Sequence, residues 1–264
     1  MLLVIDAGNT QTVVGLYELD APAAGRRPDD GLLDHWRIST DAERTSDEIA
    51  VLLQGFLGLR DRSLDDVEGL SVSSGVPRIT ASIRDMAARH LDLDPVVIEP
   101  GVRTGISILY ENPKEVGADR IANAVGAFDL YGGPTVVVDF GTATTCDAVS
   151  ASGEYLGGAI SPGIEISLDA LFGRAAALRA VELVTPRSVL GKSTVESIRS
   201  GTVYGFAAQV DGICDRIEEE LGTTTIVATG GLAGLIAPHT RCIQHHEPWL
   251  TLHGLRLVYD KNAG

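Results

Sequence analysis

The chain has 264 residues, of which 44% are hydrophobic and 22% charged, so it has the composition of a folded protein and room for two domains of about 130 residues each. No apolar run approaches the roughly 18 residues of a membrane span, and Asp6 comes too early for a signal peptide. The three cysteines, Cys146, Cys214 and Cys242, are widely spaced and odd in number, which excludes a disulfide scaffold and a thiolate zinc site. We therefore expect a cytoplasmic protein that does not bind membranes.

The charge of the chain argues against one class of partner. Acidic residues number 36 and basic residues 21, which gives a formal net charge of −15. Such a surface repels nucleic-acid backbones, and no basic cluster offsets it, so we expect no nucleic-acid binding. An anionic substrate would have to be held locally by amides, cations or metal ions.

The first half of the chain predicts a compact α/β unit. A proline- and glycine-rich loop at 21–31 separates its second and third strands. The predicted elements are, in order, strands at 2–5, 12–17 and 32–38, a helix opened by a capping box of Thr45 and Glu48, a strand at 70–73, a helix opened by Pro77, and a strand at 95–98.

The second half repeats this pattern. An apolar run again ends in an aspartate, and Asp6 and Asp139 lie 139 − 6 = 133 residues apart, about half the chain. The predicted elements are a helix directly after Arg120 marked by Ile121, Val125 and Phe128, strands at 134–139, 144–150 and 155–160, a helix after Pro162, a long helix capped by Ser193 and Glu196 that ends at Gly222, a strand at 225–229, and a strand-like stretch at 250–259. We infer an internal duplication, with domains at 1–118 and 119–264 facing each other across a cleft.

Two aspartate–glycine turns are the first candidates for chemistry. A strand-end aspartate followed by glycine allows a tight turn, whose amides and hydroxyls can hold phosphate while the carboxylate holds hydrated Mg²⁺. An ordinary hairpin turn explains one such sequence, Asp6-Ala-Gly-Asn-Thr10, about as well, but the second copy at Asp139-Phe-Gly-Thr142 favours a nucleotide triphosphate bound by both turns. Gly230-Gly231, at a strand end, is a weaker third candidate that would let adenine approach the backbone.

These three elements together resemble the superfamily of acetate and sugar kinases, heat-shock chaperones and actin. The resemblance spans the chain and implies two duplicated ribonuclease-H-like domains of the actin-like ATPase type, with ATP in the cleft between them.

A fourth candidate is Gly117-Ala-Asp-Arg120, just before a predicted helix. An acidic residue at a helix N-terminus is most often a response to the helix dipole. The functional alternative is that Asp119 accepts a hydroxyl proton during phosphoryl transfer while Arg120 binds an anionic or carbonyl group of the acceptor.

With this segment the resemblance narrows to the type III pantothenate kinases. Six motifs carry it, in order along the whole chain: Asp6-Ala-Gly-Asn-Thr10, Asn112-Pro-Lys-Glu-Val-Gly-Ala-Asp-Arg120, Val138-Asp-Phe-Gly-Thr-Ala143, Gly157-Gly-Ala-Ile-Ser-Pro-Gly163, Gly191-Lys-Ser-Thr194 and Leu250-Thr-Leu-His-Gly-Leu255. The sequence departs from the family at Ser193, where asparagine is frequent, and matches it only loosely at 175–187, which receives no site role.

The resemblance implies an enzyme that phosphorylates the primary hydroxyl of pantothenate with ATP to give 4'-phosphopantothenate, the first step of coenzyme A biosynthesis. It implies that Asp119 is the proton acceptor, that Asp139 binds a monovalent cation, K⁺ or NH₄⁺, and that Asp6 serves the Mg²⁺ that accompanies ATP. The implied ATP-binding residues are Asp6, Ala7, Gly8, Asn9, Thr10, Gln11, Thr12, Val13 and Thr142. The implied pantothenate-binding residues are Tyr110, Gly117, Ala118, Asp119, Arg120 and Thr194, the last acting across a homodimer interface.

Two other functions are compatible with parts of the sequence. One is another small-molecule kinase, or a polyphosphate-cleaving phosphatase, of the same superfamily. The other is a non-catalytic ATP-binding regulator or accessory protein, which would keep the phosphate turns and lose the base. The stretch 186–193 lacks the first glycine of a Walker A loop, and His245-His246 is interpreted as a surface turn rather than a metal site because adjacent side chains of an extended segment point to opposite faces.

Overall fold

A computed structural model describes residues 1–19, 27–175 and 178–263. The chain divides into two compact units, each described below by itself. Unit 1 consists of Met1–Leu130 together with Trp249–Gly264, and unit 2 of Tyr131–Pro248. Most of the predicted loop at 21–31, including Arg26, lies outside the described residues, and Arg27 is exposed.

A five-stranded mixed sheet forms the centre of unit 1, in the order β3-β2-β1-β4-β5. The central strand β1 pairs antiparallel with β2 and parallel with β4. The strands are β1 (Leu2–Ala7), β2 (Gln11–Tyr17), β3 (Leu32–Ser39), β4 (Gly69–Ser74) and β5 (Val96–Val97), which confirms the predicted strands. Short elements in the connections are η1 (Leu64–Asp66), β6 (Ser107–Ile108) and η2 (Pro113–Glu115).

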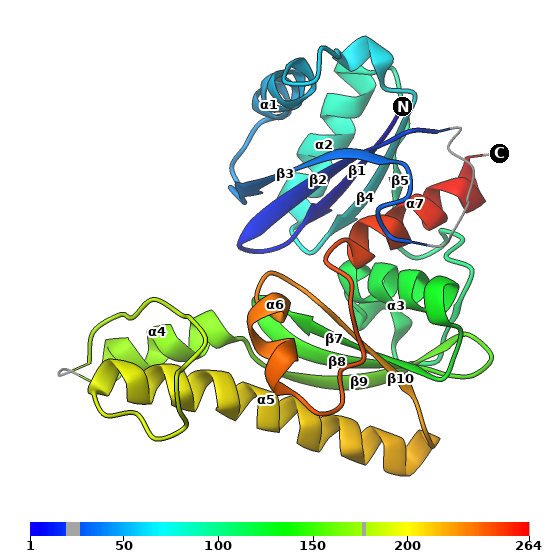
Figure 1. Ribbon diagram of the computed structural model, residues 1–264. Helices are drawn as coiled ribbons and strands as arrows, with labels where there is room; N and C mark the ends of the chain where they lie inside the picture. The colour runs from blue at the N-terminus through cyan, green and yellow to red at the C-terminus, as the bar shows by residue number, and fades with distance from the viewer. Residues whose placement is uncertain (20–26, 176–177, 264) are drawn as a thin grey trace. The chain divides into compact units, whose positions relative to one another are not determined.

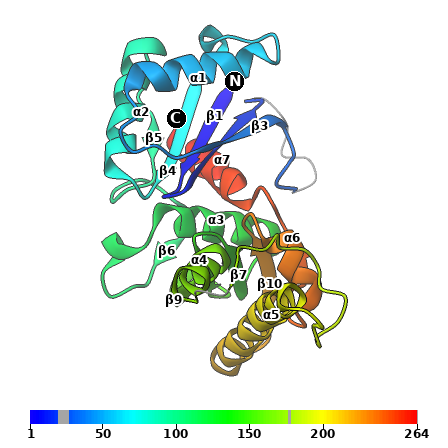
Figure 2. The same ribbon diagram turned by 90° about the vertical axis from the view of Figure 1, so that its left-hand side faces the viewer.

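Helices α1 (Ser46–Gly58) and α2 (Pro77–His90) cover one face of this sheet (Figure 1, Figure 2). Their apolar stripes pack with Leu3, Ile5 and Ala7 of β1 in one buried cluster. The predicted capping box is confirmed, since the Thr45 hydroxyl accepts from the Glu48 amide and the Glu48 carboxylate accepts from the Thr45 amide. Pro77 is the first residue of α2, as predicted.

Helix α7 (Leu250–Asn262) packs against the opposite face, on β1 and β4. The prediction of a strand-like stretch at 250–259 was therefore wrong. The buried residues Leu252, Leu255 and Val258 recur every three positions, which is the spacing of a helix and not the alternation of a strand. Helix α3 (Ala118–Tyr131) is the helix predicted after Arg120, but it begins earlier, at Ala118, so that Asp119 lies in its first turn; α3 packs on α7.

Unit 2 is built on strands whose order is β11-β10-β7-β8-β9. Their bounds are β7 (Thr135–Phe140), β8 (Ala143–Val149), β9 (Glu154–Pro162), β10 (Thr225–Thr229) and β11 (His245–His246). The helices are α4 (Ile164–Arg174), α5 (Thr194–Leu221), α6 (Ala233–Ile236) and η3 (Ala237–His239). Helix α5 packs with Val136, Val138 and Phe140 of β7, and Cys146 and Cys214 are buried in the same cluster.

The two sheets have the same construction. In each, a central strand pairs antiparallel with the next strand and parallel with the fourth, and β1 and β7 start 133 residues apart. The predicted duplication is therefore present in the topology. The compact units are divided differently from the expected boundary at 118/119, because α3 packs on α7 and both lie in unit 1.

Three local features complete the description. Ser193 caps α5 by accepting from the Glu196 amide, as predicted, while the Glu196 carboxylate accepts from the Lys192 amide instead of closing the box at Ser193. His245-His246 is an exposed two-residue strand on β10 and not the predicted turn. Within the described part of the chain, no helix combines the length and apolarity needed to span a membrane.

Candidate functional site

The turn after β1 places a carboxylate at the edge of the unit 1 sheet. Asp6 is the fifth of the six residues of β1 and is half-buried, whereas Asn9, Thr10 and Gln11 of the turn are exposed. The Gly8 amide donates to the Gln11 carbonyl at 3.0 Å, which closes the turn. The exposed polar groups are thus presented from a turn fixed by its own backbone.

Thr40, the residue directly after the neighbouring strand β3, holds this turn. The Thr40 hydroxyl donates to the Gly8 carbonyl at 2.7 Å and lies 2.8 Å from the Thr12 hydroxyl, and the Thr40 amide donates to the Thr10 carbonyl at 2.9 Å. Arg37 of β3 donates to the Gln11 side chain at 2.7 Å, which brings a guanidinium to the turn in a chain of strongly negative charge. The sequence analysis identified neither residue.

A third residue that was not predicted from the sequence lies beside Asp6, on β4. Ser73 is the direct partner of Asp6 in the parallel pairing of β1 with β4, so both side chains lie on the same face of the sheet. Ser73 is 1% exposed, and its hydroxyl finds no hydrogen-bond partner among the described residues. An unsatisfied buried hydroxyl costs free energy unless water or a ligand satisfies it.

Unit 2 has the corresponding arrangement. Asp139 is the fifth of the six residues of β7 and is half-buried, like Asp6 in β1. The Gly141 amide donates to the Ala143 carbonyl at 3.0 Å, and the Gly163 amide donates to the Thr142 carbonyl at 3.1 Å. This turn has two residues between its strands where the first has three, and Thr142 is exposed at its tip.

Gly230 lies directly against the Asp139 carboxylate. It follows β10 with a φ of +93°, and a Cβ built on it would stand 2.4 Å from Asp139 Oδ1 and 2.6 Å from the Phe140 amide nitrogen. Only glycine permits both this backbone conformation and this contact. The glycine pair singled out in the sequence therefore adjoins the second aspartate turn.

The N-terminus of α3 carries the fourth candidate segment. Asp119 is exposed in the first turn, and its Oδ1 accepts from the Arg120 amide at 2.8 Å, whereas the Arg120 side chain is buried. Gly117 adjoins the same carboxylate, because a Cβ there would lie 2.4 Å from Asp119 Oδ1. The second Asp119 oxygen can reach a ligand while the first is held by the helix.

The other predicted residues lie on separate elements. Tyr110 is half-buried in the segment after β6, within unit 1, and Thr194 is the exposed first residue of α5, in unit 2. The structure thus groups Asp6 to Val13 in one turn, Gly117 to Arg120 in one helix start, and Asp139 with Thr142 in a second turn.

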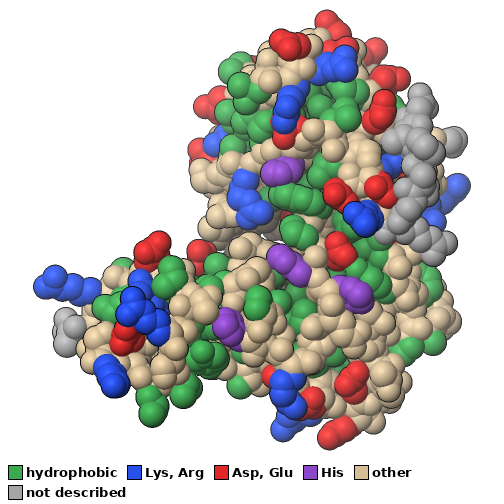
Figure 3. Space-filling model, in the orientation of Figure 1, with side chains coloured by type: hydrophobic (Ala, Val, Ile, Leu, Met, Phe, Trp, Pro, Cys, Tyr) green, Lys and Arg blue, Asp and Glu red, His purple; other side chains and the backbone are tan. Residues whose placement is uncertain are grey.

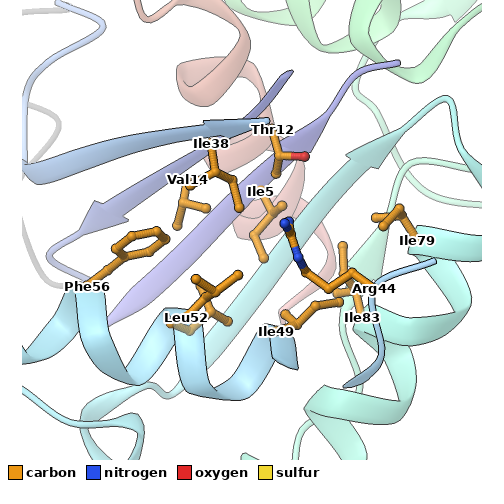
Figure 4. A pocket seen from close by; sticks show the side chains of 11 residues that line it. Ile5, Thr12, Val14, Ile38, Arg44, Ile49, Leu52, Phe56, Ile79 and Ile83 are labelled. Carbon is orange, nitrogen blue, oxygen red and sulfur yellow. The ribbon is translucent and has the colours of Figure 1, made fainter. Parts of the chain in front are cut away.

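A pocket in unit 1 lies under the first turn but has the wrong lining for a nucleotide (Figure 4). Of the predicted ATP-binding residues it includes only Thr12, and Arg44 is its single charged side chain. Its remaining lining is apolar: Ile5, Val14, Ile38, Ile49, Leu52, Leu53, Phe56, Ile79 and Ile83. It is a gap between α1, α2 and the sheet.

Among the described residues, no three histidine, cysteine, aspartate or glutamate side chains gather closely enough to form a metal site. The aspartate turns each offer one carboxylate with neighbouring hydroxyl and carbonyl oxygens. Such sets suit cations that take most of their ligands from phosphate and water.

Comparisons with known proteins identify the family to which the chain is similar. A family model described as type III pantothenate kinase matches residues 2–216. A type III pantothenate kinase of Streptomyces coelicolor is 52% identical over 272 residues, covering 100% of this chain and 99% of that protein. A type III pantothenate kinase of Saccharopolyspora erythraea is 54% identical over 270 residues, and the match covers 100% of this chain and 100% of that protein.

Solved structures support the fold independently. The inorganic polyphosphate/ATP-glucomannokinase of Arthrobacter sp. strain KM superposes with a TM-score of 0.52 at 16% identity, over 99% of this chain and 98% of that chain. At this identity the likeness concerns the fold alone, and it confirms the predicted pair of ribonuclease-H-like units. Because the family model covers most of the sequence and relatives share half of its residues over the full length, the chain belongs to the type III pantothenate kinase family.

Proposed function

We propose that this protein transfers the γ-phosphoryl group of ATP to the primary hydroxyl of pantothenate, giving 4'-phosphopantothenate for coenzyme A biosynthesis. The observation that carries the proposal is the aspartate turn repeated at the same strand position in both units, together with an exposed carboxylate at the start of α3. The first feature suits a polyphosphate donor, and the second suits an alcohol acceptor.

Asp119 is the group we assign to the acceptor proton. A primary alcohol is a weak nucleophile, and phosphoryl transfer through a loose transition state depends mainly on positioning and charge neutralisation. One Asp119 oxygen is fixed by the Arg120 amide, which leaves the other to accept the hydroxyl proton as the bond to phosphorus forms. Tyr110, Gly117, Ala118, Arg120 and Thr194 would bind the remainder of pantothenate.

The first turn fits a phosphate chain with Mg²⁺. Asp6 and the buried, unpartnered Ser73 hydroxyl share one face of the sheet, so both can bind water molecules of a hydrated cation. Mg²⁺ bound with ATP would neutralise phosphate charge. We assign the remainder of the predicted segment, Ala7 to Val13, to the phosphates as well, with the exposed residues Asn9, Thr10 and Gln11 supplying its polar groups and Thr142 as a further contact to ATP.

The second aspartate suits a larger cation. Asp139 is half-buried beside Gly230, and the turn that follows it contains the carbonyl oxygens of Gly141 and Thr142. Carboxylate and carbonyl oxygens are ligands that hard cations favour. We assign K⁺ or NH₄⁺ to Asp139, where it would reduce the repulsion between two anionic substrates.

We further propose that the active form is a homodimer. Apolar side chains are exposed on α4, on the segment before α5 and at the start of α5, next to Thr194: Ile166 47%, Leu171 41%, Val189 65%, Leu190 78% and Val195 42%. In Figure 3 apolar and basic side chains lie side by side over this part of unit 2. A second copy of the chain would remove these side chains from water.

The activity is tested by ADP release from purified protein with Mg-ATP. We expect release that requires pantothenate and is faster in potassium than in sodium. Release that ignores pantothenate would indicate another acceptor or a simple ATPase. Absence of release in both salts would favour a non-catalytic ATP-binding protein.

Replacement of the proposed base is the sharpest test of its role. Asp119→Asn should lower kcat by about 10²–10⁴-fold, the usual contribution of a general base, because the amide cannot take the proton. The Kd for ATP, measured by calorimetry, should stay within about twofold, since the phosphate turns are unchanged. Asp94→Asn, at an exposed position of unit 1, is the matched control. A variant that keeps more than about a tenth of the wild-type rate would contradict the assignment.

The cation assignment predicts a loss of salt dependence. Asp139→Ala removes the carboxylate, so its residual rate should be the same in sodium and potassium. Asp215→Ala, which loses only an exposed ion pair with Arg241, should retain the potassium response. Undiminished potassium activation in Asp139→Ala would place the cation elsewhere.

The dimer predicts a different outcome for two exposed leucines. Leu190→Asp should sediment as a monomer, because the charge would be buried at the interface. Leu59→Asp, at an equally exposed leucine of unit 1 (72%, against 78% for Leu190), should remain dimeric. A monomeric wild-type protein at micromolar concentration would rule the dimer out.

A further inference from the structure

Helices α3 and α7 meet through backbone as well as side chains. A Cβ built on Gly254 of α7 would stand 1.9 Å from the Ala122 carbonyl oxygen of α3, and one built on Gly126 would stand 2.9 Å from the Leu250 carbonyl oxygen. The helices are therefore in contact at a place where neither can carry a side chain. Any side chain at Gly254 must push them apart.

Two polar pairs, each with one buried partner, fix the register of this contact. The Thr251 hydroxyl donates to Asn123 Oδ1 at 2.7 Å, and His253 Nε2 lies 3.1 Å from Asp129 Oδ2. Asn123 is 1% exposed and His253 6% exposed. Burial lowers the pKa of His253, which favours the neutral ring, and a neutral ring can pair with the Asp129 carboxylate by donating from Nε2–H. Sliding α3 along α7 would break both pairs in a buried setting.

The other side of α7 is attached to the sheet that carries Asp6. The Ser71 hydroxyl of β4 donates to the Leu255 carbonyl at 2.9 Å, and the space over Gly15 of β2 is filled by Leu252 and by Val4 of β1. Val4 and Asp6 lie on the same face of β1, because side chains alternate along a strand. Helix α7 thus forms a layer between the sheet that carries the Asp6 turn and helix α3, whose first turn contains Asp119.

We propose that Thr251 and Gly254 are positioning residues for phosphoryl transfer, which hold α3, and with it Asp119, at a fixed place relative to the Asp6 turn. This inference rests on the proposed function. Neither residue touches the reacting atoms in this role. They act through the placement of α3. The last sequence motif, Leu250 to Leu255, lies in α7 and would thus serve the reaction by placing α3 rather than by contacting a substrate.

The chemistry makes such placement consequential. Transfer depends on the hydroxyl lying close to and in line with phosphorus, and a misplacement of about 1 Å can cost on the order of 10²-fold in rate. The expected signature is a loss in kcat with nearly unchanged ATP affinity, since the Asp6 turn is held by its own bonds to Thr40.

The test replaces Thr251 by residues of similar size. Thr251→Val keeps the shape and removes the bond to Asn123, so kcat should fall at least about tenfold while KM for ATP stays within about twofold. Thr251→Ser should restore kcat, because its hydroxyl can make the same bond. Gly254→Ala should lower kcat further. If this variant fails to fold, the comparison of Thr251→Val with Thr251→Ser still tests the positioning role.

A matched control separates positioning from stability. Ser46→Ala removes a buried hydroxyl of α1 that accepts from Arg89, in the same unit but away from α7, and should lower Tm without lowering kcat. Wild-type kcat in Thr251→Val, or an equal loss of kcat in Ser46→Ala, would overturn the inference.

A measurement without substrate distinguishes this failure from failure of the proposed function. Nitroxide labels at Asp41→Cys, beside the Asp6 turn, and Lys114→Cys, just before α3, in a Cys242→Ser background report the distance between the two segments by pulsed EPR. Thr251→Val should broaden or shift this distance. If the wild-type protein is inactive but Thr251→Val still shifts or broadens the distance between the labels, only the proposed function is rejected. If Thr251→Val leaves that distance unchanged, the positioning role is rejected.

Discussion

The central strand of each sheet carries an aspartate as its fifth residue, and this position decides which face of the sheet the carboxylate occupies. In β1, Leu3, Ile5 and Ala7 enter the apolar cluster under α1 and α2, so Asp6 must lie on the other face. In β7, Val136, Val138 and Phe140 pack under α5, and Asp139 is directed away from them in the same manner. A slip of one residue would place either carboxylate in an apolar core, at a cost of several kcal/mol.

The charge of the chain makes local geometry more important than the overall field. At a net charge of −15, phosphate and carboxylate ligands are repelled at long range, although salt screens exposed charges beyond about 8 Å. Binding must therefore come from groups within a few ångströms. In the proposed site, Arg37 at the Gln11 side chain and the unpartnered Ser73 hydroxyl beside Asp6 are the groups placed to do this, and both are supplied by strands adjacent to the turn.

Much of the fold could be predicted from the sequence, because the signals were local. Hydrophobic runs, the Thr45–Glu48 capping box, Pro77 and the repeated aspartate turns correctly indicated strands, helix starts and a duplication. Thr40 and Ser73 were missed because their importance comes from pairing: Thr40 reaches the turn only when β3 lies beside β2, and Ser73 meets Asp6 only when β4 pairs parallel with β1. The roles of the site residues rest on the resemblance and on the turns, and they stay predictions.

The wrong interpretation of 250–259 shows how tertiary contacts can override a local pattern. Gly254 weakens a helix by about 1 kcal/mol relative to alanine, and Leu250-Thr-Leu alternates like a strand, so local propensity gives little support for α7. Yet the helix forms, because Leu252 and Leu255 bury against the sheet while Gly254 admits the backbone of α3. Alanine at position 254 would favour the isolated helix and clash in the folded protein. The glycine is therefore required by the contact with α3, and α7 owes its stability to tertiary packing rather than to its own helical propensity.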